Sequence, residues 1–240
     1  MAVSTGLLLA LATTAEVQAS SGVTATVTAV TGGSLVEVSG TNGVDTVTFE
    51  EDGANYIVTS NGVTIATTSD PVRVIFEGKD GGDYFSNETD IPSTVYGGEG
   101  NDFLYGGNVD DIIYGNKGAD YIECGAGDDV VYGGNGSDEI YGGDDNDELW
   151  GEEDADAIYG GAGSDTLRGG KGDDTLVGQD DVDYIYGGNG NDDMLGCGGN
   201  DHVYGQSGSS DESDCGNDNN DTACVAEDDT AFQSNDSLCS

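Results

Sequence analysis

The stretch that decides the fold is YGGNGSDEIYGGDDNDELWG, residues Tyr132–Gly151. A glycine pair, an aspartate and an aliphatic residue return in it every nine residues. From Gly97 the same register continues without interruption through Tyr204, which gives twelve consecutive units of nine residues. A fixed short period of this kind is typical of solenoids, in which each copy is stable only when it stacks on its neighbours.

Each position of the unit makes a different demand on the chain. Glycines at positions one, two and four permit a tight loop with positive φ and carbonyls that turn inward. Position six is Asp and position eight is aliphatic or Met in all twelve units. Because side chains alternate along a β-strand, we expect residue eight to point into the core and residues seven and nine to point outward. One aliphatic residue per nine makes a thin core, so another interaction must contribute to folding.

The aspartates at position six are the candidate ligands of a metal ion. Numerous, flexible oxygen ligands suit calcium better than magnesium or a transition metal. Upstream, Gly78–Ser86 fits the pattern, and Gly40–Thr48 is an outlying match. The predicted calcium ligands are Asp83, Asp102, Asp111, Asp120, Asp129, Asp138, Asp147, Asp156, Asp165, Asp174, Asp183, Asp192 and Asp201.

A few units depart from the pattern. Position four is Val109, Asp145, Asp154 or Asp181 instead of glycine. Aspartate tolerates the left-handed region of φ/ψ space, whereas a β-branched valine tolerates it poorly. We therefore expect the weakest site around Val109. A thirteenth unit has Ser210 at position six, which indicates that the array fades there.

The unit G-G-x-G-x-D-x-U-x resembles the RTX family, the hemolysin-type calcium-binding repeat. The resemblance extends from Gly78 to about Ser213. It implies a parallel β-roll in which two nonapeptides make one turn. It also implies calcium ions between loops one turn apart, bound by position-six aspartates and loop carbonyls. Twelve loops contain ten pairs one turn apart, so we expect up to about ten ions.

The charge of the chain supports a cation as the main partner. Its 48 acidic and 5 basic residues give a formal charge of −43. A chain of this charge repels itself and should not become compact unaided. Bound calcium would then supply part of the folding free energy. A nucleic-acid partner is excluded, because the chain cannot neutralise phosphates.

The remaining segments give the predicted domain organisation. An apolar run, Leu7–Leu11, precedes small residues up to Ala19, which predicts a signal peptide over residues 1–19 and a secreted or extracellular protein, with the periplasm or cell surface as alternatives. The run is too short to span a bilayer, so no transmembrane segment is expected. Residues 20–77 should form a small β segment with a hairpin turn at Asn61-Gly62. The all-β roll itself is expected over residues 78–213, and an acidic tail with cysteines over residues 214–240.

No enzymatic motif is present in the sequence. His202 is the single histidine, so no H-E-x-x-H zinc site exists, and no nucleophile elbow occurs. We therefore expect a non-catalytic calcium-binding protein. The alternatives are an adhesin or matrix interaction module, and a repeat module derived from a larger RTX toxin or hydrolase.

Aromatic residues recur at position nine on one face of the expected roll. They are Tyr114, Tyr132, Trp150, Tyr186 and Tyr204, with Arg168 between Trp150 and Tyr186. Stacked one turn apart, they would form an aromatic ladder. Such a ladder either stabilises the strands or offers a surface to a cell-surface, polysaccharide or protein partner.

The five cysteines suggest two disulfides and one free thiol. Cys197 and Cys215 are 18 residues apart, one full turn, which places them within disulfide range. We expect Cys224 to pair with Cys239 in the tail. Cys124 would then be the free thiol.

Overall fold

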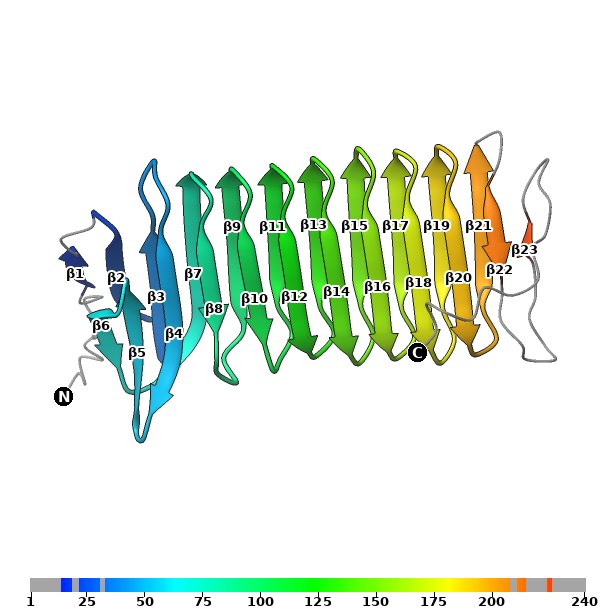
Figure 1. Cartoon of the computed structure of the whole chain (residues 1–240). Helices are drawn as coiled ribbons and strands as arrows, with labels where there is room; N and C mark the ends of the chain where they lie inside the picture. Colours follow the sequence, from blue (N-terminus) through cyan, green and yellow to red (C-terminus); the bar gives the residue numbers. More distant parts are fainter. Residues whose placement is uncertain (1–13, 19–21, 31–32, 208–210, 215–223, 226–240) are drawn as a thin grey trace, which may run out of the picture.

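The described residues of the computed structural model are 14–18, 22–30, 33–207, 211–214 and 224–225, and their regular structure is entirely β. They form two sheets that face each other across a narrow core (Figure 1). We call the twelve-stranded sheet A and the eleven-stranded sheet B. The predicted all-β roll of nine-residue repeats is confirmed.

The chain passes from one sheet to the other at every loop of the roll (Figure 1). In spatial order, sheet A contains β1 (Thr14–Gln18), β2 (Thr24–Val30), β3 (Gly33–Ser39), β7 (Pro71–Asp80), β9 (Ser93–Glu99), β11 (Ile112–Lys117), β13 (Val130–Asn135), β15 (Glu148–Glu153), β17 (Thr166–Lys171), β19 (Tyr184–Asn189), β21 (His202–Ser207) and β23 (Cys224–Val225). Sheet B contains β22 (Glu212–Asp214), β20 (Asp193–Gly198), β18 (Thr175–Asp180), β16 (Ala157–Ala162), β14 (Glu139–Asp144), β12 (Tyr121–Ala126), β10 (Phe103–Gly107), β8 (Tyr84–Asn87), β4 (Thr46–Asp52), β5 (Asn55–Ser60) and β6 (Val63–Thr68).

Neighbouring strands of the roll are parallel, and from β9 to β21 they pair in the same register. Ile113 of β11 pairs with Val131 of β13, which pairs with Leu149 of β15, so one turn contains 18 residues. Two nonapeptides therefore make one turn, as the resemblance implied. Residues at the same position of the unit therefore lie in rows along the solenoid axis.

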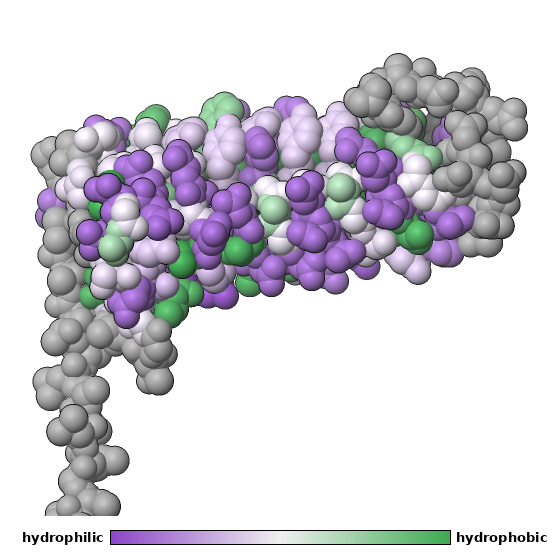
Figure 2. All heavy atoms as spheres, turned by 90° about the horizontal axis from the view of Figure 1, so that it is seen from below, coloured by the Kyte–Doolittle hydropathy of each residue, from purple (hydrophilic) through white to green (hydrophobic). Residues whose placement is uncertain are grey.

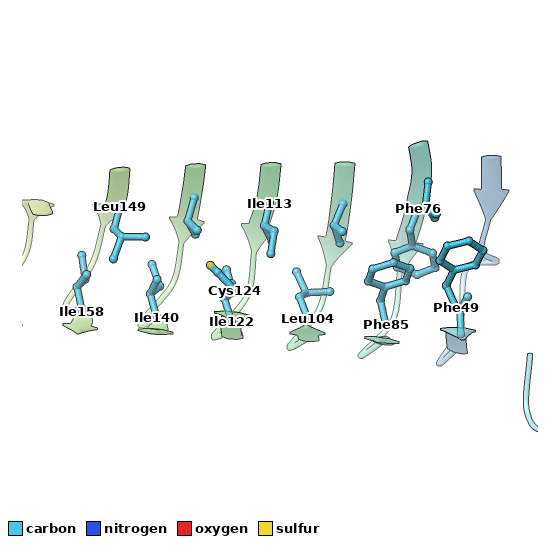
Figure 3. Close-up of a cluster of buried hydrophobic side chains, with 14 of the residues drawn as sticks. Phe49, Phe76, Phe85, Leu104, Ile113, Ile122, Cys124, Ile140, Leu149 and Ile158 are labelled. Atoms are coloured by element: carbon cyan, nitrogen blue, oxygen red, sulfur yellow. The ribbon is translucent and has the colours of Figure 1, made fainter. Parts of the chain in front are cut away.

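The core consists of the residues at position eight. Every one of them has an exposed fraction of 0 %: Leu104, Ile113, Ile122, Val131, Ile140, Leu149, Ile158, Leu167, Leu176, Ile185, Met194 and Val203. Side chains from the two sheets form two facing rows that pack against each other (Figure 3). The predicted inward direction of position eight is confirmed, and the core is one side chain deep on each side.

Antiparallel hairpins close the N-terminal end of both sheets. Strands β1, β2 and β3 pair antiparallel in sheet A, and β4, β5 and β6 pair antiparallel in sheet B. The turn at Asn61-Gly62 has positive φ at both residues, 50° and 72°, as predicted. Parallel pairing begins at β3 with β7 and β4 with β8, before Gly78. Phe76 and Phe85 stack at 4.9 Å in the core where the hairpins meet the repeats.

Replacing Leu149 by Ala should lower the free energy of unfolding by about 2–5 kcal/mol, because it leaves a cavity that the thin core cannot fill. Its neighbour Glu148 points outward from the same strand, so Glu148→Ala is the matched control, with an expected change within about 0.5 kcal/mol. Denaturant unfolding of both variants in excess calcium measures the difference. Equal effects would contradict the assignment of position eight to the core.

Candidate metal centre

The aspartates at position six form two ladders, one along each edge of the roll. Within each ladder, the backbone N–H of one aspartate donates to Oδ1 of the aspartate one turn later. Asp120 N donates to Asp138 Oδ1 at 2.8 Å, and Asp138 N donates to Asp156 Oδ1 at 2.8 Å. The first aspartate ladder contains Asp45, Asp83, Asp102, Asp120, Asp138, Asp156, Asp174, Asp192 and Asp211. The second starts at Ser93 and contains Asp111, Asp129, Asp147, Asp165, Asp183 and Asp201.

The second carboxylate oxygen is buried and unsatisfied in most of these aspartates, whereas Asp45 Oδ2 accepts the Thr41 N–H. The thirteen predicted ligands are at most 3 % exposed. Oδ2 accepts no hydrogen bond in Asp83, Asp102, Asp111, Asp120, Asp129, Asp138, Asp147, Asp156, Asp165, Asp174, Asp183 and Asp192. Native proteins rarely leave a buried polar oxygen in this state, because its desolvation costs about 1–3 kcal/mol or more when charged. A cation beside Oδ2 would remove that cost, so the donor set fits a hard metal ion.

Glycine at position one leaves the space that Oδ2 occupies. A Cβ at Gly133 would lie 2.4 Å from Asp138 Oδ2, and one at Gly151 would lie 2.1 Å from Asp156 Oδ2. Neither glycine has positive φ, so the requirement here is for space rather than for an unusual backbone conformation. Cys124 is the exception at position one, and its side chain lies in the core.

Position four requires the left-handed region of φ/ψ space. Asp145, Asp154 and Asp181 adopt it with φ of 77°, 76° and 71°, as expected for aspartate. Val109 is not among the described residues with positive φ, although Gly127, one turn later, has φ of 114°. The loop at Val109 thus differs in backbone conformation from the loops around it, at the place where the sequence predicts the weakest site.

Burial makes the aspartates difficult to ionise in the absence of a cation. It raises their pKa from the ordinary value of 3.8 to about 6 in Asp83, Asp102, Asp111, Asp165 and Asp174, about 7 in Asp120, Asp138 and Asp192, and about 8 in Asp129, Asp147, Asp156 and Asp183. The hydrogen bond from the backbone N–H lowers the pKa in each case but does not offset the burial. Carboxylates one turn away raise it further at Asp129. A metal ion would reverse this balance, because it stabilises the charged form.

The carboxylates are spread along the edges and do not gather in one cluster. Among the described residues, no group of three or more His, Cys, Asp or Glu side chains is arranged to hold a metal ion. Each turn contributes one position-six carboxylate to each edge, so a site between two turns has two of them at most. The remaining ligands would have to be backbone carbonyls of the glycine-rich loops, which calcium accepts. Hydrophilic residues cover most of the lower edge of the roll (Figure 2).

Comparison with known families agrees with this geometry. Residues 96–131, 124–158, 132–167, 159–194 and 189–209 match the family model described as the RTX calcium-binding nonapeptide repeat. The repeat array belongs to the RTX family. A comparison with curated proteins gives no match. The RTX array thus contains the buried carboxylate oxygens at the position that defines the family's repeat.

Two further aspartates belong to the first ladder, and the sequence analysis did not predict them as ligands. Asp45 N donates to Asp83 Oδ1 across 38 residues, and Asp192 N donates to Asp211 Oδ1 across 19. The outlying unit Gly40–Thr48 contained the signal for Asp45. Asp211 is one residue out of the nine-residue register, so the pattern could not identify it, and it takes the place in the ladder that the register assigns to Ser210. Ser210 itself lies outside the described residues.

The predicted aromatic ladder is present on the outer face of sheet A. Ring centroids are 5.1 Å apart between Tyr114 and Tyr132 and 4.7 Å apart between Tyr132 and Trp150. The Arg168 guanidinium lies 5.2 Å from the Trp150 ring and 5.1 Å from the Tyr186 ring. The rings cover one another's faces, so mainly their edges and hydroxyl groups remain available to a partner.

The cysteines are only partly described. Cys124 is buried and free, as predicted, and burial raises the pKa of its thiol well above the usual range. Cys197 is disulfide-bonded, but Cys215 and Cys239 lie outside the described residues. The two predicted pairs therefore stay predictions. Separately, no helix of the described residues has the length and apolarity needed to cross a bilayer.

The raised pKa values predict opposite pH dependences with and without calcium. A carboxyl whose pKa is higher in the folded state binds its proton more tightly there, so the metal-free roll should lose stability as pH rises through about 6 to 8. In chelator, lowering the pH from 8 to 5 should therefore increase β structure. In calcium the same change should raise the midpoint of the calcium titration, because protons compete for the carboxylates. Circular dichroism at both pH values measures each effect, and the same sign in both conditions would contradict the analysis.

Cys124 offers an internal probe of the folded roll. Its thiol has an exposed fraction of 0 %, so a maleimide should label it slowly in calcium and much faster in chelator. Peptide mapping without reduction identifies the labelled residue and tests the predicted Cys197–Cys215 and Cys224–Cys239 bonds. Finding Cys124 in an intramolecular disulfide would contradict the assignment.

Proposed function

We propose that the protein is an exported, non-catalytic calcium-binding β-roll protein whose repeat array folds when calcium binds. The observation that supports this most strongly is the series of buried Oδ2 atoms without hydrogen-bond partners along both edges. Position-six carboxylates and loop carbonyls would hold the ions. Bound calcium supplies positive charge and satisfies the oxygens, while the chain supplies the spacing of one turn between successive carboxylates.

The charge of the array makes folding depend on the ions. Residues 78–240 contain 40 acidic and 4 basic residues, a formal charge of −36. About ten calcium ions would add about +20 at the place where the carboxylates are most crowded. Without them, the thin core of position-eight residues has to overcome both the repulsion and the desolvation of the aspartates. The metal-free array should therefore be expanded and largely disordered.

Export is proposed from the N-terminal sequence. Cleavage after Ala19 would remove β1 and leave β2 at the edge of sheet A. The non-catalytic assignment is supported by the environment of His202, the single histidine, which stacks on Tyr184 at 4.7 Å. A stacked surface imidazole of this kind has a structural explanation and does not require a reaction.

The aromatic ladder favours a second candidate, an adhesin or matrix interaction module. Ring edges and tyrosine hydroxyls form a row on sheet A from Tyr96 to Tyr204, in which Arg168 lies between the Trp150 and Tyr186 rings. A cell-surface, polysaccharide or protein partner could bind there while calcium maintains the fold. The two candidates differ in the effect of Tyr132→Ala, which would leave calcium-dependent folding largely intact in both but abolish partner binding only in the second.

Replacing Asp138 separates the metal from the hydrogen bond. Asp138→Asn keeps an oxygen that can accept the Asp120 N–H but removes the buried charge. We expect this variant to weaken the response to calcium and to make the metal-free roll easier to form. Asp138→Ala should weaken the response to calcium and should also destabilise the metal-free roll, because it removes the oxygen that accepts the Asp120 N–H. Circular dichroism across a calcium titration, with a transition expected at about 10⁻⁴–10⁻³ M, measures these effects.

Asp201→Ala is the matched control for Asp138→Ala. Asp201 lies near the C-terminal end of the roll, so its loss should disturb fewer turns, whereas Asp138 lies in the middle of the first ladder. The response should therefore be weaker in Asp138→Ala than in Asp201→Ala. Magnesium should substitute poorly in all variants. If chelated wild-type protein keeps the compactness and β spectrum of the calcium-loaded form, the proposal is wrong.

A further inference from the structure

All basic side chains of this acidic chain lie on one sheet. The chain has 5 basic and 48 acidic residues. The five are Arg73 and Lys79 in β7, Lys117 in β11, and Arg168 and Lys171 in β17, all strands of sheet A. The strands of sheet B contain none. Sheet A therefore combines the cations with the aromatic ladder, and it differs from sheet B in a way that the repeat alone does not require.

The residues at position three of sheet A form a row in which the order glutamate, lysine, asparagine occurs twice after Asp80. From β7 to β19 the paired positions are Asp80, Glu99, Lys117, Asn135, Glu153, Lys171 and Asn189. We call them the position-three row. Lys117 forms an ion pair with Glu99, and Lys171 forms one with Glu153. These four side chains are 48–63 % exposed, so their outer sides remain open to a second charged surface.

The position-three row is complementary to itself in reverse. A two-fold axis along β13, in the plane between two facing copies of sheet A, keeps position three opposite position three and reverses the order of the turns. Asn135 then faces Asn135 of the second copy. Glu99 faces Lys171, and Lys117 faces Glu153. On each side of the axis, two carboxylates and two amines from the two copies then alternate. This arrangement favours the axis along β13 over an axis along an adjacent strand.

The same axis also matches the aromatic ladder. Tyr132 faces its own copy, Tyr114 faces Trp150, and Tyr96 faces Arg168, where a cation–π contact can form. At position seven Ile112 would face Glu148, which is unfavourable. Seven strands about 4.8 Å apart and about 20 Å long give roughly 1,300 Å² in total, near the lower limit for a specific interface. The expected complex is therefore a weak dimer, with a dissociation constant of about micromolar order.

We infer that sheet A is a self-association surface on which a second copy of this chain docks about a two-fold axis along β13. The inference rests on the proposed calcium-dependent folding, because the rows exist only in the folded roll. Calcium also lowers the repulsion between two chains that each have a formal charge of −43. A linear polyanion fits this surface less well, because Glu99 and Glu153 alternate with the lysines along the row.

Charge reversal across the axis tests the surface. In calcium, sedimentation velocity of the full chain over a concentration series should show a change from one chain to two. Lys117→Glu and Glu153→Lys should each weaken the dimer at least tenfold. The double variant should restore it, because residues 117 and 153 again attract each other between copies. Within each copy, the double variant places a carboxylate at position 117 beside Glu99 and an amine at position 153 beside Lys171. Both intramolecular pairs are then repulsive, so a restored dimer can only come from the contact between copies.

Asp180→Lys is the matched control for Glu153→Lys, since Asp180 is an exposed position-three residue of sheet B. It should leave the dimer unchanged. A calcium-folded wild-type chain that stays monomeric at the highest concentration would overturn the inference, as would a dimer unaffected by both single reversals. Circular dichroism of the same samples tests the proposed function separately: β content that does not depend on calcium contradicts that proposal, while the charge-reversal comparison still decides the docking surface.

Discussion

The structure depends on one unequal pair of oxygens. In the position-six aspartates from Asp83 to Asp192, Oδ1 accepts a backbone N–H of the preceding turn, and this bond holds successive loops together. Oδ2 of the same carboxylate, for example in Asp138, is buried without a partner. Oδ1 makes the ladder continuous, whereas the desolvation of Oδ2 opposes folding. Burying a charged oxygen without a partner costs folding free energy, and this cost is the reason why we propose that a cation binds there.

Other features of the repeat follow from that arrangement. Position one is glycine in every unit except at Cys124, because Oδ2 occupies the space of a Cβ. Position two, and position four except at Val109, adopt positive φ. The core of the roll is one aliphatic side chain deep on each side, which is consistent with the proposal that bound calcium contributes to the folding free energy. Toward the N-terminal end, where the roll meets the antiparallel hairpins, the core residues are Phe49, Phe76 and Phe85, which have larger side chains than the aliphatic residues of the roll.

Binding and assembly place different demands on the two parts of the surface. The edges contain the aspartate ladders and most of the negative charge, so they are suited to calcium. The faces contain positions seven and nine, and the position-three row lies beside them on sheet A. Sheet A uses these positions for Lys117, Arg168 and Lys171 and for the stacked rings between Tyr96 and Tyr204. Calcium binding and self-association can therefore coexist in a repeat of nine residues.

The sequence by itself determined the roll, the inward direction of position eight and the thirteen aspartates, because a strict period forces equivalent residues into equivalent places. It also located the hairpin turn at Asn61-Gly62. Only the tertiary structure brought Asp45 and Asp211 into the first ladder, since an inserted hairpin pair and a one-residue shift interrupt the register there. The different roles of Oδ1 and Oδ2 were also decided by the fold. They arise because one turn stacks on the next, and the sequence does not specify the direction in which a carboxylate points.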